Sequence, residues 1–409
     1  MEQEKRIRSD NYTQHLTQLK NFQLTLYSVP LSSCQTNPHF THLKSWIMLH
    51  IGTGSYQLLA KIHPELFHQE MSVISAIRDE NRNAIIPDRF IIIENRRYFL
   101  SIKGCGAYED MFEGGQLTQQ SLRNTCRDPN LLPKIKELTN TTGFFMAENW
   151  MGESPYGAQG ELNANDELEF STLANPLHIN GAYLCPVIAI IRIPEPIETL
   201  ARKFFWYRTY KKPFYQVIRL VPSKIRLYFE STEVLKHPEQ LMDVLGIDTG
   251  EELREFELNF IRSGIALLSL FTRSAIIQEN TIKGLIYQDV WLDKDAILAL
   301  DGTIHFADIE GLMYSTVQLA DYPNFQEKEW QKLAFEFLFA LNNLDKTRRQ
   351  LENLSLDYTS QRLELANLVQ ESLETDPIAD TTVHDRNLYI KIQWKSLPPI
   401  EIPFLEQFH

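Results

Sequence analysis

GLIYQDVWLDKDAILALDGTIHFADIEG, residues 284–311, is the stretch from which the fold of this chain is best predicted. Two short apolar runs, Ile297–Leu300 and Ile304–Ala307, flank Asp301-Gly302. Asp-Gly between apolar runs is typical of a β-hairpin with a type I′ turn, because both residues tolerate positive φ. The sequence therefore predicts a hairpin centred on Asp301-Gly302.

Acidic residues crowd both ends of this predicted hairpin. Asp289, Asp293 and Asp295 precede it, and Asp308 and Glu310 follow it. Kinase-like folds build their metal and phosphoryl-transfer site from carboxylates close to such a hairpin. A surface hairpin with solvated acids is the alternative interpretation of the same residues.

The composition limits the classes of function. The 409 residues have 43% hydrophobic content and a net charge of −13, which favours a globular protein of two lobes and argues against non-specific nucleic-acid binding. The four cysteines are too widely spaced for a disulfide framework or a zinc motif. No apolar signal segment is visible, and the longest apolar run, Ala182–Ile193, is too short to span a bilayer. We expect a cytoplasmic protein without a membrane span, although a secreted effector also fits.

Two strands, a helix and a third strand are expected in the first half of the chain. Phe90–Glu94 turns at Asn95-Arg96 into a second β-type run that stops at Lys103, where glycines follow and the ammonium could reach a phosphate. A helix is expected over Asn165–Leu177, with Glu167 and Glu169 on it, and a buried strand over Ala182–Ile193. A lone surface lysine after a strand is the simpler interpretation of Lys103.

Two arginines and a helix start are the main signals further on. Arg219 and Arg226 lie seven residues apart in apolar sequence, so each needs an anionic partner, either a polyphosphate or an internal carboxylate. Thr249 and Glu252 have capping-box spacing at the start of a long helix with core-like periodicity.

Several motifs resemble those of the selenoprotein O family and occur in the same order along the chain. The members of this family are kinase-fold proteins that transfer AMP to protein hydroxyls. The family's Lys-Gly-x-Gly is similar to Lys103–Gly106, its Arg-Glu-Phe/Tyr to Leu168-Glu169-Phe170, and its Thr-Arg-Val-Ala-x-Ser-His-Ile-Arg to Ile218–Arg226. Asp79–Arg82 resembles a Gly-Asp-Gly-Arg turn, and Ser154-Pro-Tyr with Glu161 resembles a Thr-Pro-Tyr…Gly-Asp loop. The resemblance covers about residues 75–345.

The resemblance implies an α+β, bilobal, protein-kinase-like fold that binds ATP and Mg²⁺ or Mn²⁺ and modifies a protein substrate. Glu169 would pair with Lys103, and the residues expected to hold the nucleotide are Lys103, Glu169, Arg219, Arg226, Arg82 and Glu161. Asp293 takes the place of the catalytic base, with Asp289 also in the first acidic group, and the expected metal ligands are Asp308, Asp295 and Glu310. The ATP would lie in the reverse of the usual kinase orientation.

The chain departs from the family at the catalytic loop. Lys294 stands where the family has a metal-binding Asn, and the C-terminal cysteine or selenocysteine has no counterpart. An ordinary kinase and a nucleotide-binding pseudokinase that acts as an interaction module therefore remain alternatives. The expected organisation is an N-terminal extension (1–75), a first lobe (76–195, with an insertion at about 107–150), a second lobe (196–345) and a C-terminal helix and tail (346–409).

Overall fold

The structure is a computed structural model, and it describes a discontinuous set of residues. These are 12–14, 16, 21–27, 31–43, 71–79, 83–104, 112–113, 116–117, 130, 133, 159–173, 177–179, 182–196, 198–199, 212–226, 238–274, 276–278, 281–287, 295–307, 309, 312–318, 337, 340–341, 343–353, 379–384, 387–392 and 400–404. The chain folds into two compact units. Unit 1 comprises residues 1–12, 177–185 and 222–409, and unit 2 comprises residues 13–176 and 186–221.

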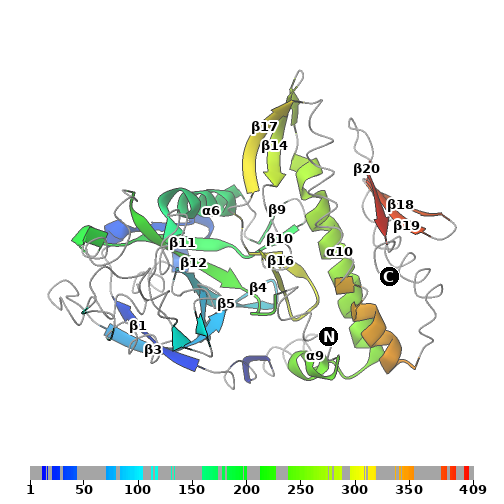
Figure 1. The fold of residues 1–409 in the computed structure, drawn as a ribbon, viewed down its shortest axis with the longest axis horizontal. Helices are drawn as coiled ribbons and strands as arrows, with labels where there is room; N and C mark the ends of the chain where they lie inside the picture. The colour runs from blue at the N-terminus through cyan, green and yellow to red at the C-terminus, as the bar shows by residue number, and fades with distance from the viewer. Residues whose placement is uncertain are drawn as a thin grey trace. The chain divides into compact units, whose positions relative to one another are not determined.

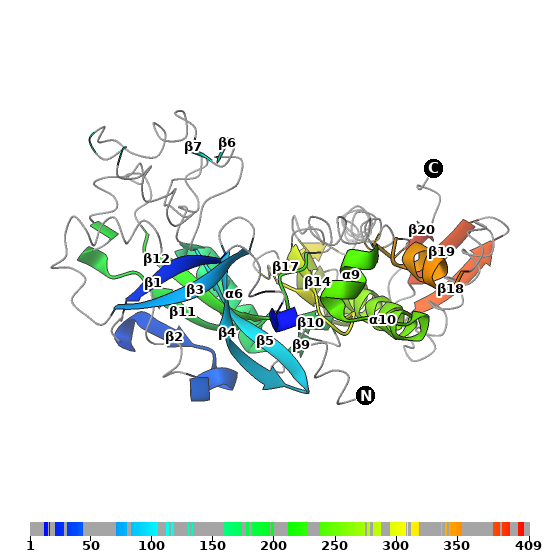
Figure 2. The same ribbon diagram turned by 90° about the horizontal axis from the view of Figure 1, so that it is seen from below.

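Unit 2 is built on an eight-stranded sheet, which Figures 1 and 2 show with its helix. Its strand order is β1 (Asn21–Tyr27), β3 (Met71–Asp79), β4 (Asn83–Ile93), β5 (Arg96–Lys103), β12 (Phe214–Val221), β11 (Val187–Arg192) and β2 (Cys34–Thr36), with β8 (Gln159–Gly160) also paired to β12. All of these pairings are antiparallel. Helix α6 (Glu161–Leu173) packs on β11 and β12.

The centre of this sheet is buried on both faces. Every side chain of β12 is buried, and so are those of β11 up to Ile191, which explains why the two strands consist mainly of apolar residues. Gln216 and Arg219 of β12 are the buried polar exceptions. The outer half of β4 instead alternates between exposed and half-buried side chains. Its hairpin to β5 turns at Glu94 and Asn95, both with positive φ (50° and 61°), one residue before the turn predicted from the sequence.

Unit 1 combines helices with small sheets. One sheet has the order β15 (Ala296–Leu298), β16 (Ile304–Phe306), β10 (Ala182–Leu184) and β9 (His178–Ile179), with β10 parallel to β16. The other sheets are β13 (Ile276–Gln278), β14 (Thr281–Tyr287) and β17 (Leu312–Gln318), and then β18 (Ala379–His384), β19 (Asn387–Ile392) and β20 (Ile400–Phe404). Helix α9 (Pro238–Leu245) precedes the long α10 (Gly250–Ser274). The described chain is thus a mixture of helices and mainly antiparallel sheets.

Helix α10 begins where the sequence predicted. Glu252 N–H donates to Thr249 Oγ1 at 3.2 Å, and Thr249 N–H donates to Glu252 Oε2 at 3.1 Å, which is the reciprocal pattern of a capping box. Further along, Phe260 stacks on Phe337 with ring centroids 5.3 Å apart. A Cβ at Gly264 would lie 2.2 Å from the Phe337 ring, so this glycine allows the close approach.

The predicted hairpin is confirmed, but its turn differs from the prediction. Gly302 N–H donates to Ala299 O at 3.0 Å, and Ala299 N–H donates to Thr303 O at 2.8 Å, so the loop has three residues, 300–302. Gly302 has a φ of 91°, whereas Asp301 is not among the described residues with positive φ. The hydrogen bonds fit a type I turn followed by a glycine bulge, not a type I′ turn. Asp301 Oδ1 stabilises this loop by accepting from Thr303 N–H at 3.1 Å.

Three further expectations are corrected by the fold. The expected strand 182–193 is two strands, because Pro186 interrupts the ladder, and β10 and β11 belong to different units. Helix α6 begins four residues earlier than expected, at Glu161, and ends at Leu173. The boundary between units after the first sheet falls at 221–222 and not at 195–196, because β12 pairs with β5 and β11 in the middle of that sheet.

Candidate functional site

Lys103 is the last residue of β5 and is almost completely buried. Gly104 follows with a φ of 94°, so the chain leaves the strand in a conformation that favours glycine. Lys103 Nζ lies 2.7 Å from Glu167 Oε1, which makes a buried ion pair within unit 2. The simple interpretation of Lys103 as a surface residue is therefore wrong.

Glu167 binds a second cation with its other oxygen. Arg219 Nη2 lies 2.6 Å from Glu167 Oε2, and Arg219 is also buried. The two cations come from adjacent strands, β5 and β12, and the carboxylate comes from α6. A buried carboxylate is costly unless it is paired and hydrogen-bonded, and here each oxygen has a cationic partner. We call Lys103, Glu167 and Arg219 the buried triad.

Glu169 does not have the role expected of it. Its side chain is exposed, whereas the buried side of α6 carries Ala164, Glu167, Leu168 and Ser171, spaced i, i+3, i+4 and i+7. Two residues along a helix correspond to a rotation of about 200°, so Glu167 and Glu169 point to different sides. Two of these four buried positions, Glu167 and Ser171, are polar, so the apolar periodicity of the sequence does not mark this side of the helix.

Glu161 is the first residue of α6 and is half-buried, so it lies in a helical first turn and not in a loop. Its backbone carbonyl accepts a hydrogen bond from Asn165 Nδ2 at 2.8 Å. A carboxylate in the first turn is favourable because it faces the positive end of the helix dipole. This position accounts for Glu161 without a ligand.

Arg226 and Asp295 both belong to unit 1. Arg226 is buried and forms an isolated antiparallel bridge with Ile297, so the two arginines predicted to act as a pair lie in different units. Asp295 is buried directly before β15, and its backbone carbonyl accepts from Ala307 N–H at 2.6 Å. This bond joins the residue before β15 to the residue after β16.

The remaining predicted site residues lie outside the described part of the chain. They are Arg82, Asp289, Asp293, Asp308 and Glu310, together with Lys294. Within the described part, no group of three His, Cys, Asp or Glu side chains is arranged to hold a metal ion. Asp295 is thus the one predicted metal ligand whose surroundings are described, and by itself it does not form a site.

Helix α10 supports the hairpin through contacts that the sequence did not predict. Asn259 Nδ2 donates to the Asp301 carbonyl at 2.9 Å, and Ile304 N–H donates to Ser263 Oγ at 2.9 Å. Gly302 lies so close to α10 that a Cβ there would be 2.3 Å from the Phe256 carbonyl oxygen. The backbone of the loop therefore packs directly against the backbone of α10.

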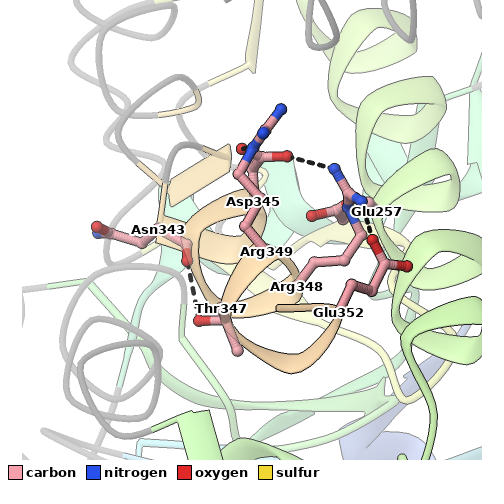
Figure 3. Close-up of polar contacts among 7 residues, drawn as sticks. All are labelled: Glu257, Asn343, Asp345, Thr347, Arg348, Arg349 and Glu352. Carbon is pink, nitrogen blue, oxygen red and sulfur yellow. Dashed lines mark hydrogen bonds and ion pairs between the residues drawn. The ribbon is translucent and has the colours of Figure 1, made fainter. Parts of the chain in front are cut away.

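A second buried ionic cluster lies in unit 1, between α10 and the helical residues 343–351 (Figure 3). Arg348 Nε donates to Glu257 Oε2 and Arg348 Nη2 to Asp345 Oδ1, both at 2.8 Å, and Arg348 also pairs with Glu352. Arg349 Nε donates to Asp345 Oδ2 at 2.8 Å. Burial raises the pKa of Glu257 to about 8; Arg348 acts against this shift and Asp345 adds to it.

Comparison with known proteins gave no assignment: no protein-family model matches the chain, and no curated protein matches it. Among the described helices, none is both long and apolar enough to cross a membrane. The buried triad in unit 2 is the candidate functional site.

Proposed function

We propose that the chain is an ATP-dependent protein adenylyltransferase with a bilobal, protein-kinase-like fold. The observation that carries the proposal is the buried triad. In protein kinases the phosphate-binding lysine lies on the third strand and pairs with a glutamate of the following helix. Lys103 likewise ends the third of the consecutive antiparallel strands β3, β4 and β5, and its partner Glu167 lies on α6, a helix that follows later in the sequence of the same unit.

Arg219 favours adenylyl transfer over ordinary phosphoryl transfer. It adds a second cation to the Lys103–Glu167 pair, so the three groups together carry one positive charge. A strongly anionic group, such as the β- and γ-phosphates, is stabilised by two adjacent cations. If those phosphates are held there, the α-phosphate is the one left for the acceptor.

The roles of the acidic residues are part of the proposal. Asp293 or Asp289 would accept the proton of a Ser, Thr or Tyr hydroxyl, and that oxygen would form a bond to the α-phosphorus. The bond from the α-phosphorus to its bridging oxygen breaks, and pyrophosphate leaves. Asp308, Asp295 and Glu310 would hold Mg²⁺ or Mn²⁺, which supplies charge neutralisation next to the phosphates. Such transfers depend mainly on positioning and charge stabilisation.

The test is to incubate the pure chain and Mg²⁺ or Mn²⁺ with ATP labelled at the α- or the γ-phosphorus. We expect protein-bound label from the α-position only, read on a gel as self-modification or on a generic acceptor protein. Lys103→Ala, which removes the phosphate-binding cation, is the matched negative control. Label from the γ-position alone would replace the proposal with a kinase.

A nucleotide-binding pseudokinase is the second candidate, and Lys294 favours it. A cation where kinases place a metal-binding Asn would repel Mg²⁺. This alternative predicts ATP binding without label transfer from either phosphorus. Lys294→Asn would then increase the affinity for Mg²⁺–ATP relative to ATP alone.

A further inference from the structure

Ser101 lies on the same face of the sheet as the buried triad. It is directly opposite Arg219 on β12, and Lys103 follows it two residues along β5. Directly opposed residues, and residues two apart on one strand, have side chains on the same face. The Ser101 hydroxyl therefore lies next to both cations of the triad.

The Ser101 hydroxyl differs from the other buried serine hydroxyls of the described chain. Ser101 is completely buried, and its Oγ has no hydrogen-bond partner in the part of the chain that the structure describes. By contrast, Ser171 Oγ accepts from Val187 N–H at 2.8 Å, Ser223 Oγ donates to Leu298 O at 2.6 Å, and Ser263 Oγ accepts from Ile304 N–H at 2.9 Å. A buried hydroxyl without a partner destabilises a fold, so it is a candidate for a ligand contact.

We propose that the Ser101 hydroxyl donates a hydrogen bond to a phosphate oxygen of a polyphosphate that Lys103 and Arg219 bind. A hydroxyl beside two cations suits an anionic oxygen, because all three groups can donate to it. An uncharged nucleobase at the same place would not neutralise the two buried cations. The inference rests on the proposed function, since it names Ser101 as a further binding residue for the same nucleotide and assigns its polyphosphate end to this face.

The experiment is a calorimetric titration of the full chain with ATP, tripolyphosphate and adenosine. Ser101→Ala removes only the hydroxyl, and we expect it to weaken the binding of both ATP and tripolyphosphate by at least about tenfold, the lower end of the effect of losing one hydrogen bond to a charged group. Adenosine affinity should not change. Ser171→Ala is the matched control, because it removes a buried hydroxyl on α6 that already has a backbone partner.

The melting temperatures of the two variants give an independent readout. Ser101→Ala should not lower the melting temperature of the ligand-free protein, whereas Ser171→Ala should lower it. A lowered melting temperature for Ser101→Ala, or unchanged tripolyphosphate affinity, would overturn the assignment of Ser101. An equal loss of adenosine affinity would do so too, because it would mean that the base lies at this face.

Failure of the proposed function gives a different result. If Lys103→Ala loses ATP binding while Ser101→Ala does not, the nucleotide site stands and the Ser101 assignment is wrong. If the wild-type chain binds neither ATP nor tripolyphosphate, both are wrong.

Discussion

Lys103 Nζ lies 2.7 Å from Glu167 Oε1, whereas Glu169, two residues further along α6, is exposed. Replacing the two glutamates should therefore have different effects on stability and on ATP binding. Glu167→Ala leaves two buried cations without their shared carboxylate, which should lower the free energy of unfolding by about 3–5 kcal/mol and weaken ATP binding. Glu169→Ala should change stability by less than about 0.5 kcal/mol. Urea unfolding and ATP titration of both variants test this, and equal effects would contradict the assignment of the pair.

Arg219→Ala should weaken the binding of ATP much more than the binding of AMP. Charge-assisted hydrogen bonds contribute about 1.5–3 kcal/mol, so we expect ATP affinity to fall about 10- to 150-fold. AMP lacks the β- and γ-phosphates, and its affinity should remain within about threefold on the same grounds. Arg219→Lys, which keeps the charge, is the control and should lose less. Equal losses for ATP and AMP would rule out the reversed orientation.

Asp293→Asn and Asp289→Asn should identify the general base. Loss of a general base lowers turnover by about 10²- to 10⁴-fold, and nucleotide binding should be little affected. Asp308→Ala should abolish transfer, because the proposed metal ligand is lost. The measurement is the initial rate of label transfer from the α-phosphorus, with ATP affinity determined in parallel. Full activity in both Asn variants would show that neither residue is the base.

The stability of unit 1 should fall as the pH rises from about 5 to 8. The folded-state pKa of Glu257 is raised to about 8 from an ordinary value of 4.5, so the folded protein binds the proton more tightly than the unfolded chain. Stabilisation from Glu257 is therefore complete below pH 4.5 and is lost as the pH rises through 8, with a slope of at most about 1.4 kcal/mol per pH unit. Groups that face Glu257 include Arg348, Asp345 and Arg254.

Glu257→Gln tests this dependence, because it keeps the shape of the side chain and removes its titration. Urea midpoints measured between pH 5 and 8 should vary less for Glu257→Gln than for wild type. Glu251→Gln, at an exposed position of the same helix, should follow the wild type. A wild-type pH dependence that persists in Glu257→Gln would assign it to other groups.

Gly302→Ala should destabilise the hairpin. An alanine at a φ of 91° is strained by at least about 1 kcal/mol, and its Cβ would also lie 2.3 Å from the Phe256 carbonyl oxygen. Gly246→Ala is the control, because Gly246 also has positive φ (62°). Thermal unfolding should show a larger loss for Gly302→Ala. A smaller loss would mean that the contact between the loop and α10 relaxes easily.

The sequence predicted those features that depend on neighbouring residues. The hairpin at 296–306, the capping box of α10 and the strand that ends at Lys103 all follow from turn chemistry, capping or periodicity over a few residues. The mixed α and β class was predicted correctly for the same reason.

The features that depend on distant residues were not predicted. Glu167 and not Glu169 meets Lys103, because the start of α6 at Glu161 and its packing on β11 and β12 determine which side is buried. That side contains Glu167 and Ser171, so its apolar pattern is weak in the sequence. The Glu257–Arg348 pair joins residues 91 positions apart, and no local pattern marks it.

The short strand β10 has a consequence for how this protein can be divided. It lies in the sequence between parts of unit 2, yet it pairs in parallel with β16, more than one hundred residues later. Neither unit is a continuous piece of chain, so no single cut releases one of them intact. Unit 1 can complete the sheet that contains β10 and β16 only after the sequence of unit 2 has been synthesised. Truncated fragments of either unit should therefore fold poorly. Circular permutation or co-expression of fragments, rather than simple truncation, is the route to studying each unit separately.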